Sequence, residues 1–316
     1  MLTYAIKRIL LAVLILIVVM LAMYAMVFLV PGDPASLALG PRATPELKRE
    51  LIARMGLDQP LFIQVYRFFA NALSGDLGYD VWSKRPVAAQ IAEVFPQTLL
   101  LGLAAMGWAV VLGVALGCSA VIYRGTFMDR MLGLLSVSLI SIPSFVVAIY
   151  LLLIFAVWLN WLPAIGAGEA GDPWSQFKAV LMPAFAIGIS WVGYLARMVR
   201  ASMLEVMGAN HIRTARAFGL PERRIVFKYA LRIAIIPTIS LLAVAFGSIL
   251  SSAVFVETVF SRPGIGTLVT AAVQKRNYPV VMGTVLTMTA FYLMVVTLAD
   301  LVIASLDPRV RDVLRG

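Results

Sequence analysis

Six apolar stretches, each about as long as the 20 residues that an α-helix needs to cross a bilayer, dominate this chain. They cover residues 9–30, 97–123, 131–159, 180–199, 230–256 and 280–305. Two of them exceed the length that spans about 30 Å of hydrocarbon, which indicates tilt or ends that project into water. The pattern predicts an all-α integral membrane protein with six transmembrane helices in one domain, residues 1–316.

Composition supports this interpretation. Hydrophobic residues make up 61% of the chain and charged residues 13%, whereas soluble domains carry roughly a quarter charged residues. A cleaved signal peptide is the alternative for the first stretch, but signal peptides have apolar cores of only about 7 to 15 residues. The only cysteine, Cys118, excludes an intrachain disulfide framework and a multi-cysteine metal site, and we interpret it as a packing residue.

Residues 31–96 are polar and mixed, with many charged, proline and glycine residues. We expect two helices in this insert, at 45–55 and 61–73. Because the insert separates the first two apolar stretches, it lies outside the membrane in this scheme.

The distribution of Lys and Arg over the short loops predicts the orientation, since cytoplasmic loops carry an excess of both. With a cytoplasmic amino terminus, the inner segments contain Lys7, Arg8, Arg124, Arg130, Arg197, Arg200, Arg213, Arg216, Arg223, Arg224, Lys228, Arg232, Arg309, Arg311 and Arg315. The outer short loops contain only Lys178, Arg262, Lys275 and Arg276. Both termini are therefore expected in the cytoplasm and the 31–96 insert on the other side.

A basic segment at residues 205–224 interrupts the apolar pattern on the inner side. Ile212, Ala215 and Phe218 recur at helical spacing on one side, and Arg213 and Arg216 share a neighbouring face. The pattern predicts a helix, a tight turn and a second helix that runs into the next span. We name this segment, residues 210–224, the elbow.

Two residues mark the turn of the elbow. Gly219 reaches the left-handed conformation without steric cost, and Pro221 suits the first turn of a helix. Glu222 then complements the positive end of that second helix. The basic surface favours contact with a partner or with anionic lipid headgroups. DNA binding is disfavoured, because the second helix merges into a span and is not a free recognition helix.

Catalytic patterns are nearly absent. The only histidine, His211, lies among arginines without a nucleophile or metal-site spacing around it. No phosphate-binding Gly-x-x-x-x-Gly-Lys-Ser/Thr loop occurs, so the chain is not expected to bind ATP itself. Asp300 lies within the last span, where an ionisable residue is a functional candidate, although pairing with an arginine or with another span explains it equally.

Small and hydroxyl-bearing residues cluster in two spans. Two interpretations remain open: close helix packing with hydroxyl bonds across helices, and a polar pathway. Pro143 breaks the third span in either case and frees backbone carbonyls, which membrane proteins tolerate where a helix is packed or lines a cavity. The candidate pathway residues are Ser138, Ser141, Pro143, Ser248, Ser251 and Ser252, with Ser136 and Ser144 beside them.

Ten short motifs in series resemble the inner-membrane permease subunit of bacterial peptide and nickel ABC importers. They are Ala5-Ile6-Lys7-Arg8-Ile9-Leu10, Pro31-Gly32-Asp33-Pro34-Ala35, Gly56-Leu57-Asp58-Gln59-Pro60, Gly75-Asp76-Leu77-Gly78, Ser141-Ile142-Pro143-Ser144-Phe145, Thr214-Ala215-Arg216-Ala217-Phe218-Gly219-Leu220, Val256-Glu257-Thr258-Val259-Phe260, Pro263-Gly264-Ile265-Gly266, Arg276-Asn277-Tyr278-Pro279 and Leu306-Asp307-Pro308-Arg309. Each motif alone is weak, whereas their order along nearly the whole chain is specific.

The resemblance implies the fold of a type I ABC importer permease in the bacterial inner membrane, without catalysis or a cofactor of its own. It implies a second permease, two ATPases that bind ATP and Mg²⁺, and an extracytoplasmic binding protein as partners. The coupling contact with the ATPases falls on Ile212, Arg213, Thr214, Ala215, Arg216, Ala217, Phe218, Gly219 and Leu220. The binding protein faces Glu257, Pro263, Gly264 and Gly266.

Three positions depart from the wider importer pattern. Arg213-Thr214-Ala215 stands where Glu-Ala-Ala is common, Pro237 lies further downstream than usual, and Asn277 replaces an aspartate. The implied cargo is di- or oligopeptides, and nickel chelates, glutathione or another small solute remain alternatives. An ion-coupled secondary transporter is the rival from another class, but the chain shows few membrane carboxylates and no inverted repeat.

Overall fold

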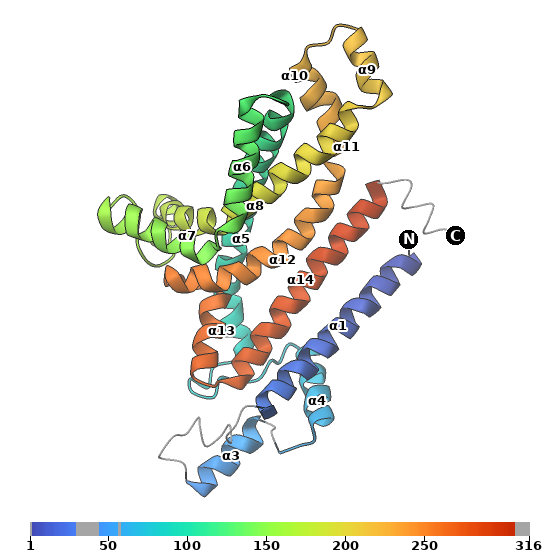
Figure 1. Cartoon of the computed structure of the whole chain (residues 1–316). Helices are drawn as coiled ribbons and strands as arrows, with labels where there is room; N and C mark the ends of the chain where they lie inside the picture. The colour runs from blue at the N-terminus through green and yellow to red at the C-terminus, as the bar shows by residue number, and fades with distance from the viewer. Residues whose placement is uncertain (1, 30–43, 56–57, 307–316) are drawn as a thin grey trace. The chain divides into compact units, whose positions relative to one another are not determined.

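A computed structural model describes residues 2–29, 44–55 and 58–306, and in this part of the chain helices are joined by turns and loops, with one isolated bridge between Tyr79 and Pro86 (Figure 1). Five helices are long and apolar enough to cross a membrane, and one bent pair of helices is a sixth candidate. The five are α1 (Leu2–Leu29), α5 (Val87–Ile122), α8 (Pro173–Met207), α12 (Ile236–Val259) and α14 (Tyr278–Leu306). The prediction of an all-α membrane fold is confirmed.

Some sequence expectations fall outside the described residues. These are the motif at 31–35, residues 56–57, and the carboxyl terminus from residue 307 with Arg309, Arg311 and Arg315. The two helices expected in the insert are present as α3 (Pro45–Met55) and α4 (Leu61–Leu73), with the bounds that the sequence predicts.

The spans extend beyond their apolar cores. α5 begins ten residues before the expected start and continues through Pro96, so its 36 residues reach about 54 Å, well beyond the hydrocarbon thickness. α8 likewise extends to both sides of the expected 180–199 and contains Pro183. α12 begins later than expected, at Ile236, because Pro237 occupies the first turn of a new helix.

The third span, expected as one stretch over 131–159, is two helices bent by 94°. α6 (Phe127–Ser141) ends before Ile142, which is extended, and α7 (Ser144–Leu151) begins after Pro143. A residue before proline is pushed out of the helical region, so the chain cannot stay helical here. α7 continues as the π-helix η2 (Leu152–Trp158). The third apolar stretch is therefore broken rather than continuous, and the break lies at Pro143, where the sequence predicts it.

The chain divides into two compact units. The first unit consists of residues 1–96 and 263–316 and contains α1, α3, α4, α13 (Ile265–Gln274) and α14. Within it Arg8 Nη1 on α1 lies 2.9 Å from Asp300 Oδ2 on α14. Pairing with an arginine, one of the explanations for Asp300, is thus what the structure contains.

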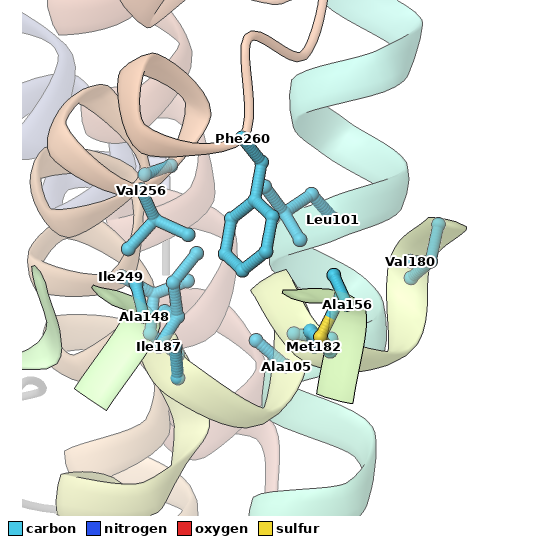
Figure 2. Packing of buried hydrophobic residues seen from close by; sticks show 13 residues of the cluster. Leu101, Ala105, Ala148, Ala156, Val180, Met182, Ile187, Ile249, Val256 and Phe260 are labelled. Atoms are coloured by element: carbon cyan, nitrogen blue, oxygen red, sulfur yellow. The ribbon is translucent and has the colours of Figure 1, made fainter. Parts of the chain in front are cut away.

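The second unit, residues 97–262, is built around α8. Buried side chains of α5, α7, α8 and α12 meet in one apolar cluster, in which Leu101, Ile187, Ile249 and Phe260 are the large members and alanines fill the spaces between them (Figure 2). Small residues let membrane helices approach closely in this way.

Two glycines of α8 set the closest approaches within this unit. A Cβ added at Gly193 would lie 2.4 Å from the carbonyl oxygen of Ser136 on α6, and one added at Gly188 would lie 2.5 Å from Trp108 Nε1 on α5. Trp108 Nε1 in turn donates a hydrogen bond to the carbonyl oxygen of Ala184 at 2.9 Å. α8 is therefore the helix against which α5 and α6 are fixed.

Candidate functional site

The elbow, residues 210–224, and residues 225–235 after it connect α8 to α12 through several short helices. α9 (Asn210–Ala217) is followed by a turn, by α10 (Glu222–Arg224), by the π-helix η3 (Ile225–Ala230) and by α11 (Leu231–Ala234). The predicted helix, turn and helix are all present. The π winding brings Ile225 and Ala230 to the same side, and both are buried.

A two-bond C-terminal cap closes α9. The Leu220 N–H donates to the carbonyl oxygen of Ala215 at 3.3 Å, and the Gly219 N–H donates to that of Arg216 at 2.8 Å, which is the Schellman arrangement. Gly219 has a φ of +73°, so its predicted left-handed conformation is confirmed. Pro221 precedes the second helix as its cap residue and does not lie within the first turn as expected.

The expected coupling residues divide between two sides of α9. Ile212 and Ala215 are buried against Val199 and Met203 of α8 and Ile225 of η3. By contrast, the Phe218 side chain is 78% exposed. The apolar side predicted from spacing is therefore corrected: it holds only the first two residues, because Phe218 lies at the cap, where the helix no longer carries it inward.

The exposed side of the elbow is basic. Its members are Arg213, Thr214, Arg216 and Ala217 on α9, Phe218 at the C-terminal cap of α9, and Arg223 and Arg224 on α10. Glu222 accepts hydrogen bonds from Arg216 at 2.6 and 3.2 Å, so one charge is partly balanced within the elbow. This hydrogen bond raises the pKa of the Arg216 guanidinium, which keeps its positive charge.

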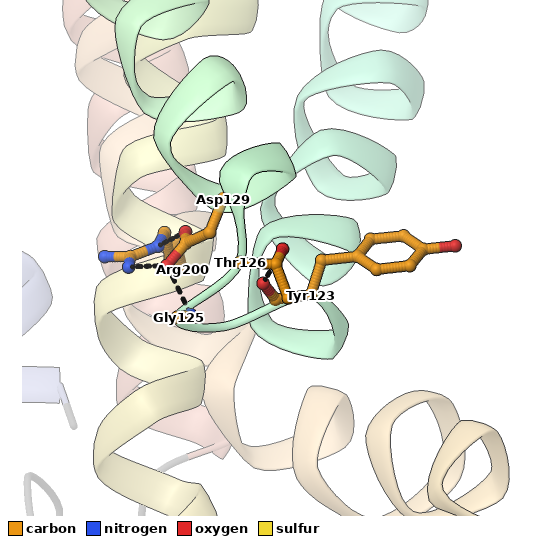
Figure 3. Close-up of polar contacts among 5 residues, drawn as sticks. All are labelled: Tyr123, Gly125, Thr126, Asp129 and Arg200. Carbon is orange, nitrogen blue, oxygen red and sulfur yellow. Dashed lines mark hydrogen bonds and ion pairs between the residues drawn. The ribbon is translucent and has the colours of Figure 1, made fainter.

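A clamp that the sequence reasoning missed joins α6 to α8. Arg200 donates two hydrogen bonds of 2.9 Å to the two carboxylate oxygens of Asp129, and the Gly125 N–H donates to the same carboxylate at 3.2 Å (Figure 3). The Tyr123 side chain points away from this pair in Figure 3. One signal was available: an acid at the start of an apolar span needs a partner, and arginines follow on α8.

The candidate pathway serines do not form one group. Ser136, beside them, is buried and donates to the carbonyl oxygen of Leu132 at 2.8 Å, which fits packing against α8. Ser138 and Ser141 on α6 and Pro143 after it are exposed, as are Ser248 and Ser251 on α12, while Ser252 is half-buried. Ser141 and Ser251 donate to carbonyl oxygens of their own helices, which satisfies their hydroxyls in an apolar setting.

One side of α12 is exposed along much of its length. Val244, Ser248, Ser251, Phe255 and Thr258 are all exposed and follow one another at intervals of four and three residues. This spacing places them on a single helix face, as in a helix that packs on a partner helix. The face combines small, hydroxyl-bearing and aromatic side chains.

The turn at the other end of α12, residues 257–262, we name the distal turn. Glu257 is fully buried and accepts a hydrogen bond of 2.6 Å from the Thr98 hydroxyl on α5. Arg262 is 1% exposed and donates to Gln97 Oε1 at 2.8 Å. Burial lowers the pKa of the Arg262 guanidinium, and the Glu257 carboxylate acts against this shift by favouring the charged form.

The residues expected to face a binding protein are mostly inaccessible. Glu257, Gly264 and Gly266 are buried, and Pro263 alone of the four is exposed. A carboxylate near the end of an apolar span is stabilised by internal donors when they are available, which accounts for the burial of Glu257. Contact of these four residues with a binding protein stays a prediction.

Asn277 lies in the first unit, just before α14. It is 3% exposed, its Oδ1 accepts from the Val81 N–H at 3.4 Å, and its side chain hydrogen-bonds Asp80. An aspartate at this position would put a second carboxylate beside Asp80, so the neutral amide suits the site. Burial alone would raise the pKa of the Asp80 carboxyl, but hydrogen bonds from the N–H groups of Ser83 and Trp82, from Asn277 and from Gln90 hold it below its ordinary value.

No group of three or more His, Cys, Asp or Glu that would hold a metal ion occurs among residues 2–29, 44–55 and 58–306. His211 is exposed on α9, and Cys118 is buried among apolar residues of the second unit.

Known proteins match the chain over nearly its full length. Residues 109–312 match the family described as binding-protein-dependent transport system inner membrane component, and residues 1–102 match the N-terminal region of such membrane components. The glutathione transport system permease protein GsiC of Escherichia coli strain K12 is 36% identical over 311 residues, which cover 98% of this chain and 99% of the relative. The protein of the same name from Salmonella paratyphi A has the same identity and coverage.

A likeness to a solved structure concerns the fold alone. An inward-facing form of the MetNI methionine ABC transporter superposes with a TM-score of 0.53 and 16% sequence identity. The match covers 69% of this chain and 96% of the other.

Proposed function

This chain belongs to the family of binding-protein-dependent transport system inner membrane components, and we propose that it forms, with a second related permease, the pathway by which short peptides cross the membrane. It is a multi-pass permease component of an ABC importer and catalyses no reaction. In the proposed assembly two separate ATPases bind ATP and Mg²⁺, and a binding protein delivers solute from the opposite side. The chain itself needs no cofactor, and both termini face the cytoplasm.

The elbow is proposed to receive motion from an ATPase, and its geometry is the observation that carries this role. α9 presents Arg213 and Phe218 outward, while Ile212 and Ala215 anchor it to α8 and η3 in one apolar cluster. Because close-packed interiors transmit displacement, a push on α9 reaches α8 directly and α12 through η3 and α11.

The exposed face of α12 supports the pathway. Its alternation of Ser248, Ser251 and Thr258 with Phe255 offers both hydroxyl and aromatic contacts, which suit a peptide's amide groups and side chains. In the same unit the chain bends by 94° at Pro143, so α6 and α7 together form a broken helix. Broken helices line transport pathways in membrane proteins.

Glutathione is the first substrate to test, because relatives that match end to end are named for its transport. Glutathione is itself a tripeptide, so the proposal of short peptides includes it. Nickel chelates or another small solute with the same architecture are the alternative cargo.

The transport proposal is tested with the permease pair, its ATPases and its binding protein in liposomes. We expect uptake of glutathione or of di- and oligopeptides only with ATP and the loaded binding protein. Uptake of a nickel chelate but of no peptide would contradict the substrate proposal. Uptake driven by an ion gradient without ATP would contradict the whole mechanism and favour a secondary transporter.

The coupling role has its own test. Phe218→Ala should weaken the association of the ATPases and reduce ATP hydrolysis stimulated by the binding protein. Phe127→Ala is the matched control, because Phe127 is 74% exposed at the start of α6 and lies outside the elbow. Equal loss of ATPase association in the two variants would refute the assignment of the elbow.

A further inference from the structure

The helix α4 has one side fixed within the first unit. Phe68, Phe69 and Ala72 pack into an apolar cluster with Leu16, Met20 and Tyr24 of α1 and with Met282 and Leu286 of α14. The rings of Tyr24 and Phe68 meet edge to face, with centroids 6.3 Å apart. Figure 1 shows α4 beside the C-terminal half of α1.

A second side of α4 is apolar and exposed. Phe62 is 70% exposed, Tyr66 74% and Leu73 90%. At roughly 100° per residue these three side chains fall within about 40° of one another around the helix. The exposed Arg67 and Asn71 lie on a different side, so α4 carries one polar strip and a wide apolar surface of which only part is covered.

The contacts with α1 place α4 at the depth of hydrocarbon. The apolar stretch of α1 covers Ala5–Met26, and the Phe68 ring of α4 meets Tyr24 near the end of that stretch. Leu16, Met20 and Tyr24 belong to the same apolar cluster as Phe68, and the rise from Leu16 to Tyr24 along α1 is about 12 Å. α4 therefore packs beside the end of the apolar part of α1, although the sequence assigns it to an extramembrane insert.

The surface of α1 is apolar and exposed. Only 11% of its apolar stretch is buried, and Val18 and Leu21 are exposed. The exposed apolar side of α4 carries no charge, since Arg67 lies on the polar strip. Aromatic side chains such as Phe62 and Tyr66 are typical of the membrane boundary, and amphipathic helices lie there with their apolar side inward.

We propose that α4 is a membrane-embedded helix, which lies in the leaflet that borders the insert and contacts phospholipid through Phe62, Tyr66 and Leu73. Arg67 and Asn71 face the headgroups and water. The occupant of this surface is phospholipid, and neither the binding protein nor a second permease is needed to cover it. The inference depends on α1 spanning the membrane, and it holds for any transported solute.

The test uses the complete transporter in nanodiscs of phosphatidylethanolamine and phosphatidylglycerol. Single cysteines replace Phe62, Tyr66, Leu73 or Asn71 in a Cys118→Ala background and carry a nitroxide label. The ratio of its collisions with oxygen to those with a water-soluble nickel chelate reports depth. Val18→Cys is the lipid reference and Ser83→Cys the water reference, since both side chains are exposed.

We expect the ratio at Phe62, Tyr66 and Leu73 to be several-fold above the water reference and close to that of Val18. At Asn71, the matched control on the same helix, it should be close to that of Ser83. Ratios equal to the water reference at all three apolar positions would overturn the proposal. Labels shielded from both reagents, with or without added binding protein, would also overturn it, because protein would then cover the surface.

A second measurement needs no substitution. A phospholipid with a photoactivatable acyl chain, incorporated into the same nanodiscs, should label the peptide that contains residues 61–73 of the unmodified chain. Labelling of the α1 peptide without labelling of this peptide would refute the proposal. Transport activity is read separately, so loss of uptake and loss of lipid contact are distinguishable.

Discussion

The elbow and the distal turn flank α12 and use similar charges in opposite ways. In the elbow, Arg216 and Glu222 pair with each other, and their own side chains are 44% and 48% exposed. The apolar residues Ile212 and Ala215 of α9 are buried. In the distal turn Glu257 and Arg262 are buried, and they bond to α5. Paired charges thus stay exposed to water in the elbow, whereas in the distal turn, away from water, they link α12 to α5.

The largest difference is expected for removing one acid from each turn. Glu257→Ala takes the carboxylate away from the buried Arg262 guanidinium, and breaking a buried charge pair in this way costs about 3–5 kcal/mol. Glu222→Ala should cost less than about 1 kcal/mol, because exposed pairs contribute little. The free energy of unfolding of the solubilised permease, from a denaturant titration, checks both, and equal costs would break the comparison.

The second largest difference in stability is expected when one hydroxyl is removed beside the distal turn and one is removed from the elbow. Thr98→Val removes the hydrogen bond to the Glu257 carboxylate, and bonds to charged groups contribute about 1.5–3 kcal/mol. Thr214→Val removes only the exposed bond to the carbonyl oxygen of Asn210 and should change stability by about 0.5 kcal/mol or less. The difference in unfolding free energy between the two variants measures the effect of burial. A larger cost at Thr214 would contradict this view of the distal turn.

A third change concerns backbone conformation in the elbow. Gly219→Val forces a β-branched residue into the left-handed region at a cost of about 1–2 kcal/mol, although an added Cβ meets no atom within 4 Å. We expect the variant to reach the membrane but to lose ATPase stimulation by the loaded binding protein. Gly219→Asn is the matched control, because asparagine tolerates this conformation. Normal stimulation in the valine variant would show that the cap plays no part in coupling.

The smallest effect on the free energy of unfolding is expected when the exposed charge of Arg216 is removed, and this effect should depend on salt. Arg216→Gln should reduce stability by less than about 1 kcal/mol, and the loss should shrink further in 1 M salt, where the screening length is about 3 Å. The cost of Glu257→Ala should persist at the same salt concentration, because buried charges are screened much less. A salt-insensitive loss at Arg216 would indicate that the elbow is shielded from water.

Local chemistry made several elements predictable. The helices α3 and α4 have the bounds expected from the sequence, and Gly219 adopts the left-handed turn that glycine alone reaches cheaply. The break at Pro143 is also local in origin, because proline restrains the residue before it. The angle of 94° is not, since it depends on what α7 packs against.

The surfaces were less predictable than the helices. Spacing put Phe218 with Ile212 and Ala215, yet the end of α9 separates them, and Glu257 accepts a buried hydrogen bond from Thr98 that no motif indicates. The clamp between Asp129 and Arg200 joins residues 71 positions apart. None of these facts follows from periodicity, because each depends on which helices become neighbours.

Apolar length, basic loops and ordered motifs are properties of the linear chain, and they are enough to identify a helical membrane permease. Tertiary contacts determine which charges are buried, which side of α9 is exposed, and that α4 lies against the apolar part of α1. Burial of a charge or an aromatic ring depends on the neighbours that surround it, and those neighbours come from distant segments of the chain.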